Sequence, residues 1–299
     1  MPLKTIAIYS PGDMGSGVGG ALGENGYDVI TSLDNRSART KELAQSSGIR
    51  DVGSIDNMVT RADLILCIMV PSQAVAAAER VAESMRSTGV TTFYADCNAI
   101  SPKTTRAIGD IITEAGGTYI DGGIIGGSPK RGQAPRFYVS GPNAWAMNEL
   151  DGKGIAVRNM GGEIGHGSGI KMCYAALTKG TSTLHIALLA AAEAMGLSDQ
   201  LRAEFQSSQP NALKQMDTGI SSLPPNAHRW IGEMEEISAT FEQVGVTPFF
   251  HQGAAEIYRL LGQTSFASET PETVDKGRPT SETIKAVVDL IDAGVATRD

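Results

Sequence analysis

Short apolar runs alternate with helical patterns over the first 150 residues. Runs of this kind, nearly continuous in apolar residues and separated by helices, are typical of a parallel sheet covered on both faces. The pattern predicts strands at residues 5–9, 28–32, 63–70, 92–96 and 118–121, and a first helix at 16–25 that stops at Gly26. It therefore predicts an α/β domain with a doubly wound parallel sheet.

The pattern changes after about residue 165. Residues 168–195 are rich in Ala and Leu and contain no proline, so they predict one long helix that ends at Gly196. More helices are expected at 198–206, 209–217, 228–244, 249–261 and 280–293. We therefore expect two domains, an α/β domain over residues 1–164 and an all-α domain over residues 165–299.

Composition and charge exclude several classes of protein. The 299 residues are 41% hydrophobic and 19% charged, which is a globular profile, and the net charge is −8. A chain this acidic is not expected to bind nucleic acid, which requires a basic face. No run of about 20 apolar residues occurs, so no membrane span is expected either.

The cysteines and histidines predict neither disulfides nor a metal site. The three cysteines are far apart in apolar runs, which favours buried free thiols and a reducing, cytoplasmic location. No pair of them, and no arrangement of the four histidines, has the spacing of metal ligands. These residues are Cys67, Cys97, Cys173, His166, His185, His228 and His251.

A glycine-rich turn follows the first predicted strand and opens the first helix. In a dinucleotide-binding G-x-G-x-x-G turn, glycines allow a tight bend and close approach of the backbone to the pyrophosphate, which the helix N-terminus attracts. The second and third glycines are Gly12 and Gly15, with Asp13 and Met14 between them, while Ser10 replaces the first. A plain strand–turn–helix is the alternative, but the position favours an NAD(P)-binding Rossmann domain.

The end of the second strand carries residues that could distinguish NAD from NADP. An acid at this position accepts hydrogen bonds from the ribose of NAD, whereas an arginine beside a hydroxyl binds the 2′-phosphate of NADP. The sequence offers both, in Asp34 and in Arg36 with its neighbours Asn35 and Ser37. We expect NADP in preference to NAD.

The order of these motifs resembles that of the β-hydroxyacid dehydrogenase family, which includes 3-hydroxyisobutyrate and 6-phosphogluconate dehydrogenases and has imine reductases as relatives. Asp13-Met14-Gly15 matches the end of the family's glycine turn, and Val70-Pro71 its apolar-proline strand end. Residues 96–102 resemble its D-x-S-T-x-x-P segment, with Asn98 and Ala99 replacing the serine and threonine. Residues 121–127 resemble D-x-P-V-S-G-G, with Ile125 replacing the serine.

The most specific part of the resemblance lies at the start of the long helix. The family has G-x-G-x-x-x-K-x-x-N there, and this chain has Gly165, Gly167 and Lys171, with Tyr174 at the asparagine position. The resemblance implies that Lys171 is the catalytic acid/base. Several family signatures are altered on the substrate side, which indicates a divergent branch with a different substrate.

The resemblance also implies where cofactor and substrate would bind. Cofactor contacts would come from the glycine turn, from residues 34–37, and from Val70, Pro71 and Asn98. Substrate contacts would come from Asn98, Gly126, Gly127 and Tyr174, and from Arg229 and Glu233, which lie near the family's K-D-L motif, where Gly232 replaces the lysine. A turn-forming Asn98, a plain turn at Gly126 and Gly127, a core Tyr174 and a solvated Arg229 are the structural alternatives.

Lysine chemistry fits this assignment. Hydride transfer is the cofactor's own reaction, and the protein must orient the substrate and handle one proton. A lysine could take the hydroxyl proton of an alcohol and return it to the alkoxide in the reverse direction. The helix dipole disfavours a cation near a helix N-terminus, which makes a purely structural lysine at position 171 a poorer explanation.

The sequence therefore predicts an NAD(P)-dependent dehydrogenase or reductase that acts on a β-hydroxy acid or a related small polar molecule, with an anionic group expected on it. An imine reductase is the alternative enzyme, and a nucleotide sensor without catalysis is the alternative of another class. The length and apolar character of the helix at 168–195 also predict a homodimer.

Overall fold

The computed structural model describes residues 2–270, 273–275 and 277–294, so residues 1, 271–272, 276 and 295–299 of the two predicted domains lie outside the described part. The chain forms two compact units, Met1–Tyr174 and Ala175–Asp299. The sequence-based boundary at residue 164 was placed just before the long helix, which begins at His166. The compact units divide ten residues later, because the first turns of that helix pack on the α/β unit.

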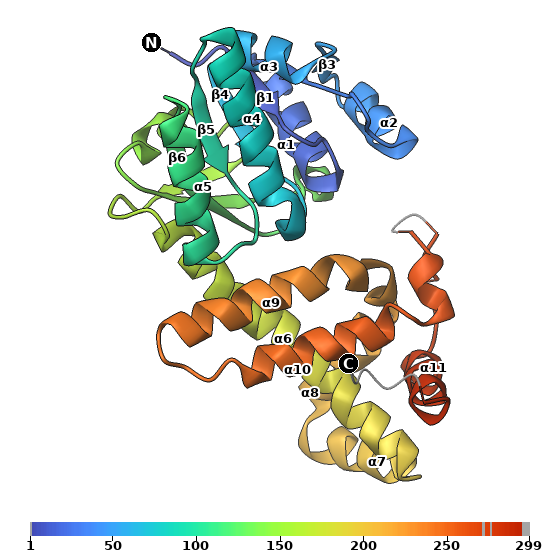
Figure 1. Cartoon of the computed structure of the whole chain (residues 1–299). Helices are drawn as coiled ribbons and strands as arrows, with labels where there is room; N and C mark the ends of the chain where they lie inside the picture. Colours follow the sequence, from blue (N-terminus) through green and yellow to red (C-terminus); the bar gives the residue numbers. More distant parts are fainter. Residues whose placement is uncertain (1, 271–272, 276, 295–299) are drawn as a thin grey trace. The chain divides into compact units, whose positions relative to one another are not determined.

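The described part of the first unit is built on an eight-stranded sheet with the order β3-β2-β1-β4-β5-β6-β7-β8 (Figure 1). Strands β1 to β6 pair in parallel, β7 runs antiparallel to β6, and β8 is parallel to β7. The strands are β1 Thr5–Ile8, β2 Asp28–Thr31, β3 Arg50–Asp51, β4 Leu64–Cys67, β5 Phe93–Asp96, β6 Thr118–Ile125, β7 Arg136–Ser140 and β8 Ala156–Asn159.

This fold confirms the predicted α/β class, but the sheet is not wholly parallel. The five predicted strands are present, with β6 extending four residues beyond Asp121. Three strands were not predicted. Strand β3 has only two residues, both exposed, and strands β7 and β8 come after a turn rich in Gly and Pro that breaks the alternation of strands and helices. The extension places Gly122–Ile125 of β6 beyond the end of β5 and beside β7.

Helices cover both faces of the sheet, as expected for a doubly wound fold. Buried apolar side chains of α1 (Asp13–Glu24) and α2 (Ala38–Ser46) pack on one face, including Val18, Leu22 and Ala44. Those of α3 (Ile55–Arg61), α4 (Ala74–Thr88) and α5 (Pro102–Glu114) pack on the other. Helix α1 ends at Glu24 with Asn25 as its C-cap, and Gly26 follows with a φ of +91° that suits glycine.

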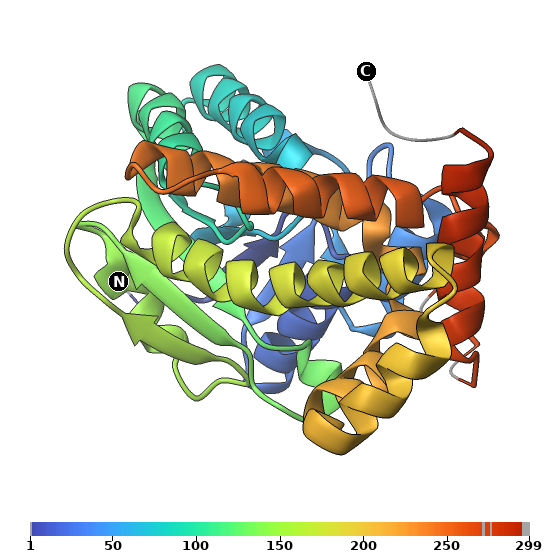
Figure 2. The same cartoon turned by 90° about the horizontal axis from the view of Figure 1, so that it is seen from below.

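Helix α6, His166–Ala194, has 29 residues, which confirms the predicted long helix (Figure 2). The helical unit also contains α7 Ser198–Ser208, α8 Pro210–Gly219, α9 Ala227–Gln243, α10 Phe249–Leu261 and α11 Thr280–Asp292. Its buried side chains include Ile186 of α6, Met234 of α9 and Ala255 of α10. Among the described helices, we find none with the length and apolar character that a membrane crossing requires.

The cysteines correct one prediction. Cys67 and Cys97 are buried free thiols, as expected, and burial raises the pKa of Cys67 to about 12. Cys173 is exposed, because it lies on the outer side of α6 and not in a packed core. An apolar sequence run therefore does not bury each of its residues when the run forms a helix with one open side.

The carboxyl group of Asp121 joins the sheet to the start of α6. It accepts hydrogen bonds from the hydroxyls of Thr105 on α5, Ser140 on β7 and Ser168 on α6. It also accepts from the backbone N–H groups of Gly165 at 2.9 Å and Ser168 at 3.2 Å. These N–H groups lie at a helix start, where no intrahelical carbonyl can accept from them. The wholly buried Asp121 therefore fixes where α6 begins.

We predict that Asp121→Ala strongly destabilises the α/β unit, because it leaves three buried hydroxyls and two buried N–H groups without this acceptor. The loss of unfolding free energy should be roughly 3 kcal/mol. For a unit of this size, that corresponds to a fall of about 6–12 °C in Tm by calorimetry. Asp110→Ala on the exposed side of α5 is the control and should change Tm by less than about 2 °C. Equal shifts in the two variants would contradict this role of Asp121.

Candidate functional site

The glycine turn between β1 and α1 is held together by its own backbone. Ser10 has a φ of +117°, and its carbonyl accepts a hydrogen bond from the N–H of Gly12 at 2.8 Å. A Cβ on Gly15 would lie 2.6 Å from that same carbonyl oxygen, so Gly15 permits α1 to start close to the strand. Around Gly12 there is no atom within 4 Å of a Cβ position, which leaves space beside the helix N-terminus. The close approach of a pyrophosphate to the backbone would use space of this kind, and that contact stays a prediction.

The turn after β2 carries the residues predicted to select the cofactor. Asn35 has a φ of +56°, which forms the turn. The guanidinium of the following residue, Arg36, lies 5.2 Å from the centre of the Tyr9 ring. The Ser37 hydroxyl caps α2 by accepting from the N–H of Thr40. Asp34 is exposed. Asp34 and Arg36 both line the pocket beside this turn.

Arg39, the next arginine after Arg36 in the sequence, forms an ion pair within the protein. Its guanidinium forms an ion pair with Asp13 in the first turn of α1, with an N–O distance of 2.6 Å. This pair links α2 to the glycine turn. Arg39 therefore supports the loop, and Arg36 is the arginine that faces the space after β2.

A pocket of about 390 Å³ opens beside this turn. Tyr9, Ile55 and Met58 give it apolar walls, and its charged lining consists of two arginines and two acidic residues, Arg36, Arg80, Asp34 and Asp56. The hydroxyl of Ser32 lines the same pocket, is buried, and has no hydrogen-bond partner in the described structure. A buried hydroxyl without a partner is costly, so a ligand with polar edges fits this pocket. An adenosine group has a flat apolar face and polar edges of this kind.

Asn98 lies just beyond β5 and is almost fully buried. Its side-chain oxygen accepts from the N–H of Met69 at 2.6 Å, and its amide nitrogen donates to Asp96 at 3.0 Å and to Cys67 at 3.4 Å. The side chain therefore ties the end of β4 to the end of β5. Both amide hydrogens are used inside the protein, so a contact from this side chain to a ligand would have to use its oxygen.

The other predicted loop residues lie at the carboxyl ends of strands. Val70 and Pro71 follow β4, and Pro71 begins the 3₁₀ turn Pro71–Gln73. Gly126 and Gly127 follow β6, and Gly126 has a φ of +115°, which requires glycine. The crevice outside the carboxyl ends of parallel strands is where ligands bind in open α/β sheets. These residues therefore lie at the carboxyl edge of the sheet, and their contact with a ligand stays a prediction.

Lys171 is held against the end of β6 by two glycines. A Cβ on Gly123 would lie 2.6 Å from the Cβ of Lys171 and 2.6 Å from the carbonyl oxygen of Gly167. A Cβ on Gly167 would lie 2.6 Å from the carbonyl oxygen of Tyr138 on β7. Side chains at either position would push α6 away from the sheet. Lys171 is therefore placed by close backbone packing, and Tyr174 is half exposed one turn later.

The last two predicted residues belong to the helical unit. Glu233 on α9 is buried and forms an ion pair with Lys179 of α6, with an N–O distance of 2.7 Å. The Lys179 ammonium also lies 5.7 Å from the centre of the Trp230 ring. Arg229 is exposed near the start of the same helix. Glu233 therefore joins α9 to α6 inside the helical unit through this ion pair.

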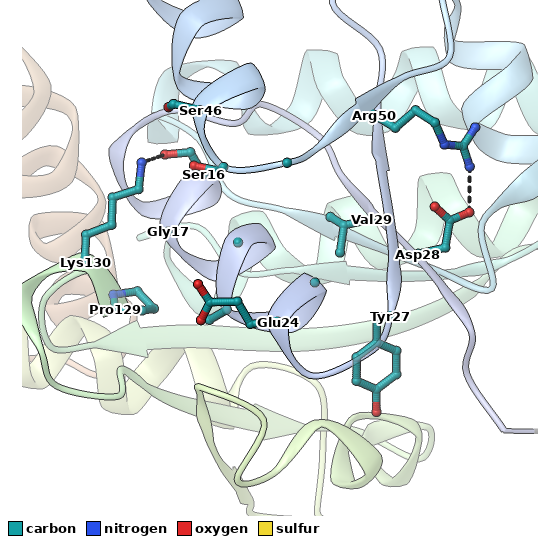
Figure 3. Close-up of a pocket in the computed structure, with 15 residues that line it drawn as sticks. Ser16, Gly17, Glu24, Tyr27, Asp28, Val29, Ser46, Arg50, Pro129 and Lys130 are labelled. Carbon is teal, nitrogen blue, oxygen red and sulfur yellow. Dashed lines mark hydrogen bonds and ion pairs between the residues drawn. The ribbon is translucent and has the colours of Figure 1, made fainter.

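A second pocket, of about 710 Å³, runs along the glycine-rich side of α1 (Figure 3). Lys130 reaches across it to the hydroxyl of Ser16 at 3.0 Å, and Arg50 pairs with Asp28 at its other end. A Cβ on Gly17 would lie 2.0 Å from the Ser128 hydroxyl oxygen and 3.1 Å from Cδ of Pro129, so a side chain there would require these neighbours to shift. The pocket thus lies outside the glycine turn itself.

Sequence reasoning missed several residues that shape these sites. Tyr9 directly follows β1, Ser32 directly follows β2 and Arg80 lies on α4; they come together in the smaller pocket, and no local motif links them. Asp121 and Gly123 were quoted only as part of a motif. Their contacts with α6 depend on pairing of β6 with β7, which was not predicted.

Two family models match the chain. Residues 5–150 match the NAD binding domain of 6-phosphogluconate dehydrogenase, and residues 192–261 match a domain of unknown function, DUF1932. The first match covers β1 to the 3₁₀ turn Ala144–Leu150, including both the glycine turn and the turn after β2. The α/β unit is therefore an NAD-binding domain of the dehydrogenase type.

Known relatives agree with this. The chain is 25% identical over 174 residues to an uncharacterized 28.5 kDa protein of Methanothermus fervidus. The match covers 58% of this chain and 65% of that relative, which is just under two thirds of the relative's length. The conserved protein MTH1747, of unknown function but structurally similar to 3-hydroxyacid dehydrogenases, is 26% identical, with a TM-score of 0.62 over 86% of this chain and 96% of that one. A 3-hydroxyisobutyrate dehydrogenase of Mycobacterium tuberculosis, with L-serine, shares the fold at 18% identity, with a TM-score of 0.65 over 96% and 99% of the chains.

Two substitutions in the glycine turn should separate protein packing from ligand approach. Gly15→Ala should lower stability by roughly 1–3 kcal/mol, because its Cβ would overlap the Ser10 carbonyl. Gly12→Ala should leave Tm unchanged, since its φ of −73° and open surroundings accept a Cβ. It should nevertheless weaken dinucleotide binding more than tenfold, as measured by fluorescence titration with NADH and NADPH. Full affinity in Gly12→Ala would contradict binding of the pyrophosphate at this turn.

Proposed function

The chain belongs to the β-hydroxyacid dehydrogenase-like family, as a divergent member, and we propose that it transfers a hydride between a nicotinamide cofactor and a small polar alcohol or carbonyl compound. The observation that carries this proposal is the placement of Lys171 in the NAD-binding unit. Gly123 and Gly167 hold it at the carboxyl end of β6, and the glycine turn follows the carboxyl end of β1. In a parallel sheet these ends lie along one edge.

Lys171 is the proposed acid/base. The bound nicotinamide would accept or give the hydride. In alcohol oxidation, the Lys171 amine takes the hydroxyl proton from the substrate oxygen as that hydride leaves the adjacent carbon. In carbonyl reduction, the ammonium returns the proton to the same oxygen. General acid–base catalysis of this kind contributes about 10²–10⁴-fold to the rate.

We further propose that the cofactor is NADP. Arg36 lines the pocket after β2, and its guanidinium lies over the Tyr9 ring. Arg80 brings a second positive charge to the adjoining pocket. A doubly charged 2′-phosphate gains more from two guanidinium groups than a ribose hydroxyl does. Asp34 and Asp56, which line the same pocket, are the features that favour NAD.

The proposed substrate is small and carries an anionic group. The backbone N–H groups of Gly126 and Gly127 lie beyond β6, the strand against which Lys171 is held, and Gly126 has no side chain to obstruct them. Such a pair of N–H groups can receive a carboxylate. Tyr174, one turn after Lys171, would supply a further hydrogen bond, and Asn98 would fix the strand ends beneath the substrate. Arg229 and Glu233 are the candidates from the helical unit.

An imine reductase is the second candidate, favoured by Tyr174 in place of the family asparagine. The retained lysine favours oxygen chemistry, because an alkoxide requires a proton donor. The proposal also includes a homodimer, from the apolar length of α6, and a cytoplasmic location, from the two buried free thiols.

A substrate panel tests the function directly. The purified protein is mixed with hydroxy acids, the matching aldehydes and ketones, and cyclic imines, each with both cofactors, and nicotinamide absorbance is followed. We expect turnover with a hydroxy or keto acid. Turnover confined to the imines would establish the alternative, and cofactor binding without any turnover would favour the sensor.

Lys171→Ala should reduce kcat by at least about a hundredfold with the best substrate of the panel, because no other group is assigned to the proton. Dinucleotide affinity, measured by fluorescence titration, should stay near normal. The control is Lys153→Ala, an exposed lysine of the same unit, which should retain full activity. Full turnover by Lys171→Ala would remove the proposed mechanism.

Arg36→Ala should weaken binding of NADPH at least tenfold more than binding of NADH, because only NADPH places a phosphate beside this side chain. Calorimetric titration with the two cofactors measures this difference. Arg61→Ala, at the exposed end of α3, is the charge-matched control and should affect both equally. An equal loss for the two cofactors in Arg36→Ala would exclude the phosphate role.

A further inference from the structure

Alternate side chains of β6 and β7 face the start of α6. In an antiparallel pair, residues directly opposite each other point to the same face of the sheet, and every second residue along each strand does so. Asp121 and Ser140 form one opposite pair, their side chains are hydrogen-bonded to each other, and both contact the start of α6. Gly123 and Tyr138 form the next pair on this face.

The third pair on this face is Ile125 with Arg136. Helix α6 advances along the pairs: its first residues are bonded to the first pair, and the Cβ of Lys171 lies 2.6 Å from the Cβ position on Gly123 in the second. Ile125 follows Gly123 in the same direction by two residues. Arg136 therefore lies on the same face as Lys171, one pair further toward the carboxyl end of β6.

The guanidinium of Arg136 has no partner in the described part of the chain. The residue is half-buried. Within residues 2–270, 273–275 and 277–294 its side chain forms neither a hydrogen bond nor an ion pair, whereas Arg39 and Arg50 in the same unit are each paired with an aspartate. A cation that has lost part of its water and gained no partner is unfavourable. An anion beside Arg136 would offset that cost.

The chain is locally cationic at this place. Its net charge is −8, but no acidic residue occurs between Asp121 and Glu149. The basic residues of this stretch are Lys130, Arg131 and Arg136. An acidic protein repels an anionic substrate overall, so a site for one requires cations close to it. The segment that joins β6 to β7 supplies them.

The turn of Gly126 and Gly127 lies beside Arg136. The Cα of Pro135, which directly precedes Arg136, lies 3.6 Å from the position of a Cβ on Gly126. The side chain of Arg131 crosses the second glycine, with its Cδ 3.3 Å from the Cβ position on Gly127. The backbone N–H groups of the turn and the strand residue Arg136 are therefore neighbours.

The segment after the turn is anchored on α1. The hydroxyl of Ser128 donates to the carbonyl oxygen of Asp13 at 3.1 Å, and the ammonium of Lys130 donates to the hydroxyl of Ser16 at 3.0 Å. These contacts hold the turn in place before any substrate arrives. A site whose groups are already held in place loses less entropy on binding.

We infer that Arg136 binds the carboxylate of the substrate together with the N–H groups of Gly126 and Gly127, and thereby selects hydroxy acids over neutral alcohols. The inference rests on the proposed function, in which Lys171 handles the hydroxyl proton. Arg136 determines specificity and takes no part in proton or hydride transfer. Ile125 replaces the serine of the family motif, and the arginine opposite it supplies a polar contact that isoleucine cannot make.

The spacing of the two groups suits a short hydroxy acid. Gly123, which holds Lys171, and Ile125, which lies opposite Arg136, are two residues apart, or about 7 Å along a strand. A molecule whose hydroxyl and carboxylate are a few bonds apart can reach both side chains. A carboxylate also accepts two parallel N–H bonds from one guanidinium, which a lysine cannot offer.

Kinetics with an acid and its amide provide the test. Arg136→Met keeps an unbranched apolar stem and removes the charge. With the best hydroxy acid of the panel, KM should rise at least about tenfold and kcat should stay within about twofold, because a contact made equally in the ground and transition states changes KM alone. With the uncharged primary amide of the same acid, wild type and Arg136→Met should have equal kcat/KM.

Two further variants separate charge recognition from packing. Arg136→Lys keeps the charge but not the planar fork, so it should recover part of the loss. Arg86→Met, at the exposed end of α4, is the charge-matched control and should behave as wild type. Equal losses of kcat/KM for the acid and the amide in Arg136→Met would indicate disturbed packing and would overturn the inference.

Arginine-selective labelling tests the contact without turnover. Wild-type protein with oxidised cofactor is treated with phenylglyoxal, and labelling of Arg136 and Arg86 is followed by peptide mass spectrometry. Excess malonate, a carboxylate without a hydroxyl, should slow labelling of Arg136 severalfold, whereas malonamide and sodium chloride at matched ionic strength should not. Labelling of Arg86 should be unchanged throughout. An Arg136 that does not react, or that reacts equally with malonate and malonamide present, would contradict the inference.

The two experiments distinguish this inference from the proposed function. If no compound of the panel is turned over while malonate still protects Arg136, the proposed function is wrong and the carboxylate site stands. If turnover is found while Arg136→Met discriminates between acid and amide as wild type does, the function stands and the role of Arg136 is wrong.

Discussion

The buried carboxyl group of Asp121 is the point at which the sheet, α5 and the start of α6 are joined. It satisfies hydroxyls from three elements and two N–H groups at the beginning of the helix. Because a helix start has no internal acceptors, this carboxyl group decides where α6 can begin. Gly123 and Gly167 then let the helix approach the strand closely enough to place Lys171 beside β6. The proposed chemistry depends on this one contact region.

The two ends of the proposed site have different physical bases. At the cofactor end, Ser10, Gly12 and Gly15 form a turn from their own backbone, and Arg36 and Ser32 face an open pocket. This end therefore has space and a polar group, the Ser32 hydroxyl, that a ligand could contact. At the substrate end, the Asn98 side chain is already bound to protein groups. The residues that can still select a substrate there are those near Lys171, such as Gly126 and Tyr174.

Much of the fold was predictable because its signals are local. The apolar runs of β1, β2, β4 and β5 and the uninterrupted pattern of α6 each lie within a few turns of chain. Strands β7 and β8 were not predictable, because a Gly- and Pro-rich turn precedes β7 and its pairing with β6 reverses direction. For the same reason the role of Asp121 could not be derived, since Ser140 comes from β7.

The candidate site divides in the same way. The glycine turn and Lys171 could be named from motifs, because their spacing is short and specific. The pocket formed by Tyr9, Ser32 and Arg80 could not, since these residues are up to 71 positions apart in the sequence. The exposure of Cys173 and Leu184 was also hidden, because sequence shows that α6 is apolar but not which side is covered.

Transfer of a labelled hydride tests the central claim most directly. The carbonyl compound that the protein reduces best is incubated with nicotinamide cofactor carrying deuterium at the reactive C4 position, and the product is analysed by mass spectrometry. The account predicts that one of the two C4 positions delivers its deuterium to the former carbonyl carbon, making the product one mass unit heavier. A product that carries no deuterium from either labelled cofactor would contradict hydride transfer by this protein.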